Sequence, residues 1–141
     1  MNIHLTRQYS LSASHRLHNP TLGEAENRRI YGKCNNPYGH GHNYVIEVTV
    51  SGAPEPATGM VASLADLDGF VKREVLDPFD HRYLNEEIPL FRERVPTTEN
   101  LCVEIYRRLR SFPHAHLERI RIEETALNSF EYSGEPLGRT E

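Results

Sequence analysis

Two stretches of this chain alternate apolar and polar residues with a period of two, and this pattern constrains the fold more than any other feature. In residues 3–15, the apolar side chains of one parity are Ile3, Leu5, Tyr9, Leu11 and Ala13. In residues 42–52, the equivalent row is Tyr44, Ile46, Val48 and Val50. Side chains two residues apart in a strand project to the same side of a sheet. Both stretches are therefore predicted to be strands with one buried face.

Two later segments carry apolar residues at helical spacing instead. In residues 63–76 these are Leu64, Leu67, Phe70, Val71 and Val75, and in residues 96–112 they are Leu101, Ile105 and Leu109. Ser63 and Asp66 stand three residues apart at the start of the first segment, as in a capping box, and Thr97 is placed to cap the second. Both segments are predicted to be helices.

The rest of the chain is predicted to complete the sheet or to connect its elements. Residues 117–127 and 129–134 are expected to be two further strands, separated by a turn near Asn128. Residues 19–33 and 77–89 have no clean period and are expected to be loops. The resulting order, strand–strand–helix–helix–strand–strand, predicts an α+β fold in which both helices pack on one face of an antiparallel sheet.

Length and charge limit the classes of protein that fit this pattern. A chain of 141 residues with 38% hydrophobic residues suits one domain, spanning residues 1–141, with a single core. The net charge of -4 argues against a broad nucleic-acid-binding surface. Because no apolar run reaches membrane-spanning length and the first residues do not resemble a signal peptide, no membrane partner is expected and a cytoplasmic location is predicted. With two cysteines, Cys34 and Cys102, no disulfide framework is expected.

Three histidines are placed to converge at one end of the predicted sheet. His40 and His42 have the parity of Tyr44 on the second strand, and His15 continues the apolar parity of the first. Three neutral imidazoles can bind zinc and leave its fourth tetrahedral position open, which is the arrangement of catalytic zinc sites. A single HxH pair is also common as a polar strand entry, so it is the agreement of parity across two strands that favours a metal site.

Cys34 precedes this histidine pair, and two roles are open to it. It can be a fourth zinc ligand, or it can act as a nucleophile or base if nearby cations or a metal lower its pKa. Four basic residues lie near it in the sequence: Arg16, Arg28, Arg29 and Lys33. The alternative for each of them is a position in a solvated loop. Cys102 lies beside the apolar stripe of a predicted helix and is expected to be a core thiol.

Glu124 stands on a face where a carboxylate needs an explanation. It shares the parity of Ile120 and Ile122, and burying an unpaired carboxylate is costly. It can accept two parallel N–H bonds from the 2-amino-4-oxo edge of a guanine or pterin ring, or it can form an internal salt bridge with Arg7. Its neighbour Glu123 has the opposite parity and is predicted to face the other side of the sheet.

The adjacent pair Asp80–His81 lies in the loop predicted after the first helix. Two neighbours in sequence do not themselves make a nucleophile–base arrangement, but together they can act on a group brought from elsewhere. The alternative is that Asp80 caps a turn and that His81 is exposed. The dipeptide alone favours this alternative.

Taken together, these residues resemble the motifs of the 6-pyruvoyl-tetrahydropterin synthase family. The matching segments, in order, are SASHRL, IYGKCNNPYGHGHNY, TGM, LADL, DH at 80–81, PTTEN at 96–100 and ET at 124–125. They extend over roughly residues 9–135. The resemblance implies the tunnelling fold (T-fold), in which monomers form a trimer around a β-barrel and two trimers stack into a homohexamer.

The resemblance also implies a set of site residues. The implied zinc ligands are His15, His40 and His42, the implied catalytic residues are Cys34, Asp80 and His81, and the implied pterin-binding residues are Glu124, Thr97 and Thr98. In this family the active site lies between subunits. Asp80 and His81 would therefore meet Cys34 across an interface, which accounts for an Asp-His pair without a partner nearby.

The implied reaction is the lyase-type conversion of 7,8-dihydroneopterin triphosphate to 6-pyruvoyltetrahydropterin with loss of triphosphate, a step of tetrahydrobiopterin biosynthesis. Cys34 would be the general base, and His81, oriented by Asp80, a proton donor or relay. The four basic residues near Cys34 are candidates to meet the triphosphate. The family often has an aromatic residue in place of Glu123, and residues 126–127 are less polar here, which leaves the fine substrate preference open.

Two other functions fit parts of this pattern. The sister enzyme 6-carboxytetrahydropterin synthase, of queuosine biosynthesis, shares the fold and the zinc but tends to have the shorter spacing CxxxHGH. Five residues separate Cys34 from His40 in this chain, which favours the pyruvoyl enzyme. The other function is a non-catalytic zinc- or pterin-binding oligomer. The presence of Cys34, Asp80 and His81 argues against it.

Overall fold

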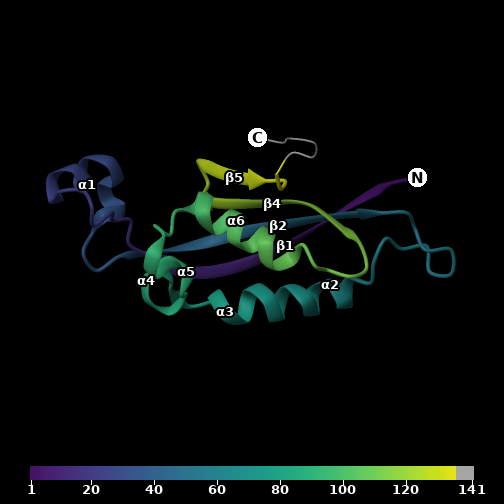
Figure 1. The fold of residues 1–141 in the computed structure, drawn as a ribbon. Coiled ribbons are helices and arrows are strands. Elements are labelled where there is room, and N and C mark those ends of the chain that lie inside the picture. Colours follow the sequence, from purple (N-terminus) through teal and green to yellow (C-terminus); the bar gives the residue numbers. More distant parts are fainter. Residues whose placement is uncertain (136–141) are drawn as a thin grey trace.

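The computed structural model describes residues 1–135 and shows an α+β fold built on a twisted sheet (Figure 1). Its first two strands are long and pair antiparallel along their whole length. They are β1 (Ile3–His15) and β2 (His40–Gly52), with Ile3 opposite Gly52 and His15 opposite His40. The pairing of the two ends brings the predicted metal ligands to the same point of the sheet.

Three further strands complete the sheet in the order β3-β1-β2-β4-β5. β4 (His116–Thr125) pairs antiparallel with β2, and β5 (Asn128–Tyr132) pairs antiparallel with β4. The short β3 (Arg82–Tyr83) pairs parallel with β1 at Ala13 and Ser14. The prediction of a wholly antiparallel sheet is therefore wrong at this edge, because a two-residue strand has no periodicity to be detected.

The two predicted helices are present and cover the same face of the sheet (Figure 1). α2 (Leu64–Val71) continues through a π-helical turn (Lys72–Leu76) into α3 (Asp77–Phe79), so this helical segment is longer than predicted. α6 (Thr98–Leu109) packs against β4 and β5. None of the helices within residues 1–135 is long and apolar enough to cross a membrane.

Both predicted helix caps are formed. The Ser63 hydroxyl accepts the backbone N–H of Asp66, and the Thr97 hydroxyl accepts the backbone N–H of Asn100. Each bond satisfies one of the backbone donors that a helix leaves free at its first turn. Thr97 therefore fixes where α6 begins, directly beside the end of β1 that carries the histidine.

Two segments predicted to be loops contain helices. Residues 19–33 include α1 (Glu24–Tyr31), which lies apart from the sheet in Figure 1 and is followed by a 3₁₀ turn (Gly32–Asn35). Residues 77–89 include α3, β3 and α4 (Leu84–Glu87), and α5 (Leu90–Glu93) follows. α4 and α5 are single turns, which are too short for an apolar stripe to be recognised.

α1 has no apolar stripe, and polar contacts hold it in place instead. Asn27 is its one buried residue, and its side-chain amide donates to the backbone carbonyls of Asn19, Leu22 and Gly23. The side-chain oxygen of Asn27, Oδ1, accepts the backbone N–H of Asn19. A fully satisfied buried amide can hold a segment in place without a hydrophobic face.

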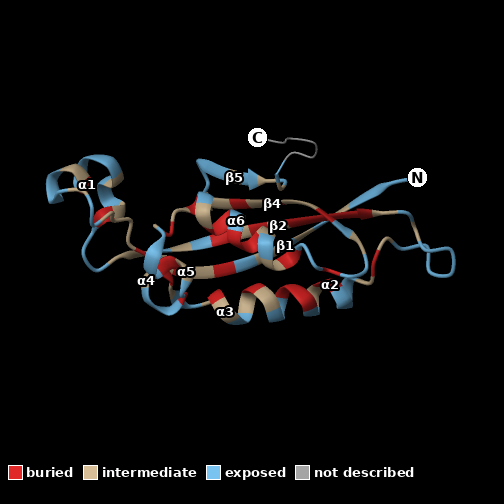
Figure 2. Cartoon of the chain, viewed as in Figure 1, coloured by how far each residue is buried: buried red, intermediate tan, exposed pale blue. Residues whose placement is uncertain are grey.

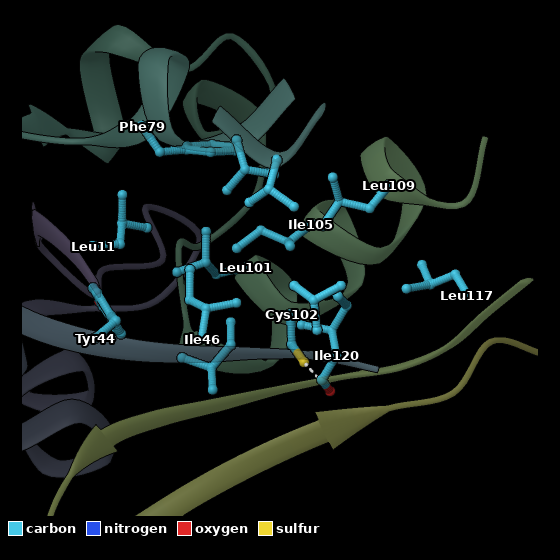
Figure 3. Close-up of a cluster of buried hydrophobic side chains, with 14 of the residues drawn as sticks. Leu11, Tyr44, Ile46, Phe79, Leu101, Cys102, Ile105, Leu109, Leu117 and Ile120 are labelled. Atoms are coloured by element: carbon cyan, nitrogen blue, oxygen red, sulfur yellow. Dashed lines mark hydrogen bonds between the residues drawn. The ribbon is translucent and has the colours of Figure 1, made fainter. Parts of the chain in front are cut away.

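The core lies between the sheet and the helices, where the buried residues gather in Figure 2. In Figure 3, Ile46 and Ile120 of the sheet face Leu101 and Ile105 of α6, and Phe79 covers them from the α3 side. Burying each of these side chains contributes roughly 1.5–3 kcal/mol.

Cys102 belongs to this core, as predicted. Its thiol lies 3.4 Å from the carbonyl oxygen of Ile120, to which it donates. Burial raises the pKa of this thiol to about 12, so it stays protonated at neutral pH. The sequence predicts no disulfide framework, and Cys102 and Cys34 are both free thiols.

Candidate metal centre and adjoining site

The histidine cluster lies where β1 ends and β2 begins. His15 and His40 are directly opposite each other in the ladder, and His42 follows on the same face of β2. The three ring centroids lie 4.9, 4.9 and 4.7 Å apart, and the rings are inclined by 81° to 83° to one another. The parity of two strands thus brings the three predicted ligands into one compact array.

His15 has the hydrogen-bonding pattern of a metal ligand. Its ring is fully buried, and its Nδ1 lies 2.8 Å from the backbone carbonyl oxygen of Pro96. Because a carbonyl oxygen can only accept, Nδ1 carries the proton and Nε2 presents its lone pair. That Nε2 is buried without a partner, as is Nδ1 of His40. A buried lone pair without a donor is costly in a protein interior, and a bound cation would satisfy it.

Burial also keeps His15 neutral. Burial lowers the pKa of His15 to about 4. The hydrogen bond to the Pro96 carbonyl raises this pKa, and the charges of His42 and His40 lower it further. The pKa of His42 is lowered by burial as well. Neutral imidazole is the form that binds metals, so these side chains are available as ligands at neutral pH.

Cys34 lies at the edge of the cluster. Its sulfur is 3.5 Å from Nε2 of His40, and the ligand atoms of His15, Cys34 and His40 all lie within 4.8 Å of one another. Nε2 of His40 is also 2.9 Å from Nε2 of His42, a separation that suits one N–H bond or two lone pairs facing a shared cation. Within residues 1–135, His15, Cys34 and His40 are thus the one group of three whose ligand atoms all lie this close, and His42 joins the cluster through its contact with His40.

The loop before β2 is held against β1 by its backbone. The N–H of Leu17 donates to the carbonyl oxygen of Cys34 at 2.7 Å. Gly39 has φ 72°, and a Cβ there would lie 3.0 Å from the carbonyl oxygen of His15 and 3.1 Å from the ring of Tyr83. Only glycine fits this left-handed, crowded position, so Gly39 sets the closeness of the thiol to the histidines.

The thiol of Cys34 is not activated by the groups of this chain. Burial raises the pKa of Cys34, and the negative charge of Glu124 raises it further. Lowering of this pKa by nearby cations or by a metal, the condition for Cys34 to act as a base, stays a prediction. A cation bound by the histidines would oppose both effects.

Glu124 faces the cluster, as its parity predicts. One carboxylate oxygen accepts the hydroxyl of Thr98, and the other lies 3.6 Å from Nε2 of His42. The alternative salt bridge with Arg7 is not formed, because the Arg7 guanidinium pairs with Asp68 at 3.0 Å. Among the described residues 1–135, Glu124 is thus paired with no lysine or arginine, and it borders the cluster with its side chain 14% exposed.

Asp80 and His81 lie at the β3 edge of the sheet. The His81 side chain is 80% exposed, and its Nε2 is 3.6 Å from an oxygen of Asp80. His81 borders an open hollow of about 290 Å³ that Ser12, Asn43 and the proposed zinc ligand His42 also line. Within residues 1–135, no hydrogen bond or ion pair joins Asp80 or His81 to Cys34 or the three histidines.

Three of the four basic residues near Cys34 border one hollow. It has a volume of about 620 Å³, and Arg16, Arg28 and Lys33 line it together with His18. Arg29 is not part of its lining and instead pairs with Glu26 on the surface of α1. Arg16 and Lys33 directly follow and precede the predicted metal-site residues His15 and Cys34, so the hollow adjoins the cluster.

Sequence reasoning missed two groups that shape this site. One is the Pro96 carbonyl oxygen, which fixes the tautomer of His15. The other is Asn35, a buried residue whose amide donates to the carbonyl oxygen of Leu17 and contacts Nδ1 of His18. A backbone carbonyl has no signature in the sequence, and Asn35 has none that separates it from an ordinary turn asparagine.

The comparisons with known proteins point to one family. A family model described as 6-pyruvoyl tetrahydropterin synthase matches residues 4–135. A 6-pyruvoyl tetrahydrobiopterin synthase of Poecilia reticulata is 47% identical over 133 residues, which cover 94% of this chain and 90% of that protein. The solved structure of Caenorhabditis elegans 6-pyruvoyl tetrahydropterin synthase superposes with a TM-score of 0.90 at 41% identity, covering 96% of this chain and 97% of the other. A 6-carboxy-5,6,7,8-tetrahydropterin synthase of Haemophilus influenzae is 27% identical over 72% of this chain and 84% of its own length.

Proposed function

The chain belongs to the 6-pyruvoyl tetrahydropterin synthase family, and we propose that it is a zinc-dependent lyase that converts 7,8-dihydroneopterin triphosphate to 6-pyruvoyltetrahydropterin and triphosphate. One observation carries this proposal. A buried imidazole with an unpartnered Nε2 stands within a cluster that also contains a free thiol and borders a carboxylate that no lysine or arginine of residues 1–135 pairs with. Metal, base and pterin anchor are the three elements that the reaction needs.

The residues of the cluster fit a zinc ion. We assign His15, His40 and His42 as its ligands because their rings are nearly equidistant and two of the three are neutralised by burial. When bound in a site with an open position, zinc polarises the oxygen atoms of a substrate and makes neighbouring C–H and O–H groups more acidic. Cys34 is assigned a place beside the metal, although His15, Cys34 and His40 are the alternative set of ligands.

Cys34 is the proposed general base. The reaction breaks the carbon–oxygen bond to the triphosphate, and a base must first remove a proton from the side chain of the substrate. The positive charge of the metal site would lower the pKa of Cys34, which the metal-free chain raises. His81, with Asp80 beside it, is the proposed proton donor or relay.

The pterin ring is assigned to Glu124. Its carboxylate can accept two parallel N–H bonds from the 2-amino and ring N–H groups of a pterin. The hydroxyl of the buried Thr98 holds one of its oxygens and thereby fixes its direction. Thr97 contributes the start of α6 beside it, and its own hydroxyl is engaged as the helix cap.

The triphosphate is assigned to the hollow lined by Arg16, Arg28 and Lys33. Three cationic side chains in a concave site attract a polyanion, and guanidinium groups bind phosphate oxygens in pairs. Arg29 is left out because it does not line the hollow; Glu24, which lies 3.9 Å from Arg28, also lines it and would have to release Arg28 to the phosphate. The position of the hollow next to His15 and Cys34 lets one substrate extend from the cluster into it.

The proposed assembly is the T-fold homohexamer, with active sites between subunits. Two features support it. In the described part of the chain, the outer edge of β1 pairs with another strand only at Ala13 and Ser14, and β5 has a neighbour on one side only. Unpaired strand edges of this kind can pair with a second copy. In addition, His81 is exposed and, within residues 1–135, forms no hydrogen bond or ion pair with Cys34, which fits a proton donor that acts on the site of a second chain.

The product of the reaction tests this proposal. The purified, zinc-loaded protein is incubated with 7,8-dihydroneopterin triphosphate, and the products are identified by mass spectrometry. We expect 6-pyruvoyltetrahydropterin and triphosphate. A 6-carboxy product with release of acetaldehyde would instead identify the sister activity, which the five-residue spacing from Cys34 to His40 argues against.

Two cysteine variants separate catalysis from mere binding. Cys34→Ala should lose turnover and keep its zinc, whereas Cys102→Ala, which alters the only other thiol, should keep both. A Cys34→Ala protein that loses its zinc would make Cys34 a ligand and overturn the assigned set. A variant that keeps every function of the unaltered protein would support a non-catalytic zinc- or pterin-binding oligomer.

A further inference from the structure

Both backbone groups of Ser12 face the outer edge of β1, and two consecutive residues satisfy them. The Ser12 N–H donates to Oδ1 of Asp80 at 2.9 Å, and the N–H of His81 donates to the carbonyl oxygen of Ser12 at 2.6 Å. Strand β3 begins only with Arg82, opposite Ala13. The Asp80 carboxylate therefore stands in for the carbonyl oxygen that a longer β3 would offer at this point.

This pair of bonds holds an unfavourable backbone conformation. His81 has φ 60°, and within residues 1–135 it is the only non-glycine residue with a positive φ. The left-handed conformation is unfavourable for a residue with a Cβ and persists where the surroundings impose it. Here the surroundings are the two bonds to Ser12 on one side and the two-residue strand on the other. The bonds thus determine the direction in which the exposed imidazole leaves the chain.

The contact between the two side chains is weaker than the contact with the backbone. Nε2 of His81 lies 3.6 Å from Oδ2 of Asp80, which is longer than a hydrogen bond. Oδ1 lies 2.9 Å from the Ser12 nitrogen, within ordinary hydrogen-bond length. The position of Asp80 is therefore set by the strand edge, and its other oxygen is left loosely beside the imidazole.

We propose that Asp80 is a positioning residue, whose carboxylate ties the His81 turn to β1 and so fixes where the imidazole stands in the active site. This inference rests on the proposed function for its catalytic consequence, but the tie itself is a property of the chain alone. It differs from a role in which the negative charge of Asp80 acts on the imidazole. The two roles separate on substitution, because asparagine keeps an oxygen that accepts the Ser12 N–H and has no charge.

The test compares Asp80→Asn with Asp80→Ala. A small misplacement of a proton donor can cost about 100-fold in rate. We expect Asp80→Ala to lower kcat by about 100-fold with little change in KM, and Asp80→Asn to recover at least about tenfold of this loss. Equal losses in the two variants would overturn the proposal, because the charge would then be the property that matters.

Hydrogen exchange supplies a readout without substrate or metal. The exchange of the Ser12 amide, followed by mass spectrometry on overlapping peptides, should accelerate about tenfold or more in Asp80→Ala and stay protected in Asp80→Asn. Unchanged protection in Asp80→Ala would contradict the tie even if the protein proved to have another activity. If both variants lose activity but the Ser12 amide stays protected in Asp80→Asn, the hydrogen bond between Asp80 and Ser12 is supported. The proposed effect of this bond on catalysis is then overturned.

Glu87 provides a matched control. Its carboxylate accepts the backbone N–H of Tyr83 at 2.6 Å and lies 3.5 Å from the Arg82 guanidinium, so it too fastens β3 through a main-chain donor, but at the last residue of the strand and not at His81. Glu87→Ala should leave kcat within about twofold of the unaltered protein. A fall in kcat as large as that of Asp80→Ala would show that any loosening of the β3 edge is enough to impair turnover. It would overturn a specific role for Asp80.

Discussion

His15 and His40 stand opposite each other on two strands that pair over their whole length, whereas His81 precedes a strand of two residues. The first pair is buried or half-buried, each ring has one buried nitrogen without a partner, and Nε2 of His40 contacts Cys34 and His42. His81 is exposed, has a left-handed backbone, and is held by bonds to one residue of β1. The proposed metal cluster is thus buried within the chain, whereas the proposed proton donor is exposed at the sheet edge, where the proposed assembly would place a second copy.

This difference predicts different sensitivities for the two regions. Substitutions in the buried cluster should act on metal binding in the isolated chain. Substitutions at the β3 edge should leave metal binding unchanged and act only on the assembled enzyme.

The largest effect is expected for His40→Ala. The variant removes a ligand that both sets of donors share, so zinc affinity should fall by at least about 100-fold. Turnover should be lost with it. Zinc content after dialysis against a competing chelator measures the change. His81→Ala, in the exposed half, should keep its zinc, and a loss of zinc there would contradict the separation of the two regions.

Glu124→Gln should weaken pterin binding by about 100-fold, because a charge-assisted pair of hydrogen bonds becomes neutral and mismatched. Titration of the protein with a non-reacting pterin, followed by fluorescence, gives the affinity. Glu123→Gln changes the neighbouring carboxylate on the opposite face of the sheet and should bind as the unaltered protein does. Equal effects of the two substitutions would remove Glu124 from the proposed anchor.

Glu104 should affect stability and its pH dependence without touching either half of the site. Burial alone would raise the pKa of Glu104, but hydrogen bonds from Arg107 and Arg108 outweigh burial and lower it. The contacts of Glu104 with the two arginines therefore stabilise the fold fully at a pH above the unfolded carboxyl pKa of about 4.3. This stabilisation is lost as the pH falls through the lower pKa that Glu104 has in the folded state. Glu104→Gln should destabilise by roughly 1–3 kcal/mol at neutral pH. Urea unfolding at pH 7 and pH 3 should show a smaller difference from the unaltered protein at pH 3 than at pH 7.

The smallest effect is expected for His81→Gly. Glycine adopts the left-handed conformation without a Cβ penalty, so the free energy of unfolding should rise by up to about 1 kcal/mol even though turnover is lost. Denaturant unfolding of the zinc-free protein measures it. A clear destabilisation would mean that the His81 side chain itself stabilises this edge, which its exposure does not indicate.

The same contrast explains what the sequence can predict. The period of two in residues 3–15 and 42–52 determines which side chains share a face, and this period is enough to place His15, His40 and His42 together. The same argument places Glu124 beside them. Each of these predictions depends on a long, regular element, for which pattern and tertiary structure agree.

The regions that escape prediction are short or held by polar contacts. α1 has Asn27 as its one buried residue, so no apolar stripe marks it. β3 has two residues and adds a parallel pair to a sheet whose pattern predicts antiparallel pairing alone. The conformation of His81 depends on Ser12, far away in the sequence, and no local rule connects the two. The proposed meeting of Asp80–His81 with Cys34 depends on assembly, for which a single sequence carries no local pattern.

Complementation between two inactive variants tests the shared site most directly. Cys34→Ala and His81→Ala are each expected to lose about 100- to 10,000-fold in turnover. Co-expressed with different tags and purified as mixed oligomers, they should recover on the order of a quarter of full activity, because one site in four then combines both intact halves. Cys34→Ala mixed with His40→Ala, which damages the same half, should recover nothing. Mixed oligomers of Cys34→Ala and His81→Ala that stay inactive would contradict an active site built from two chains.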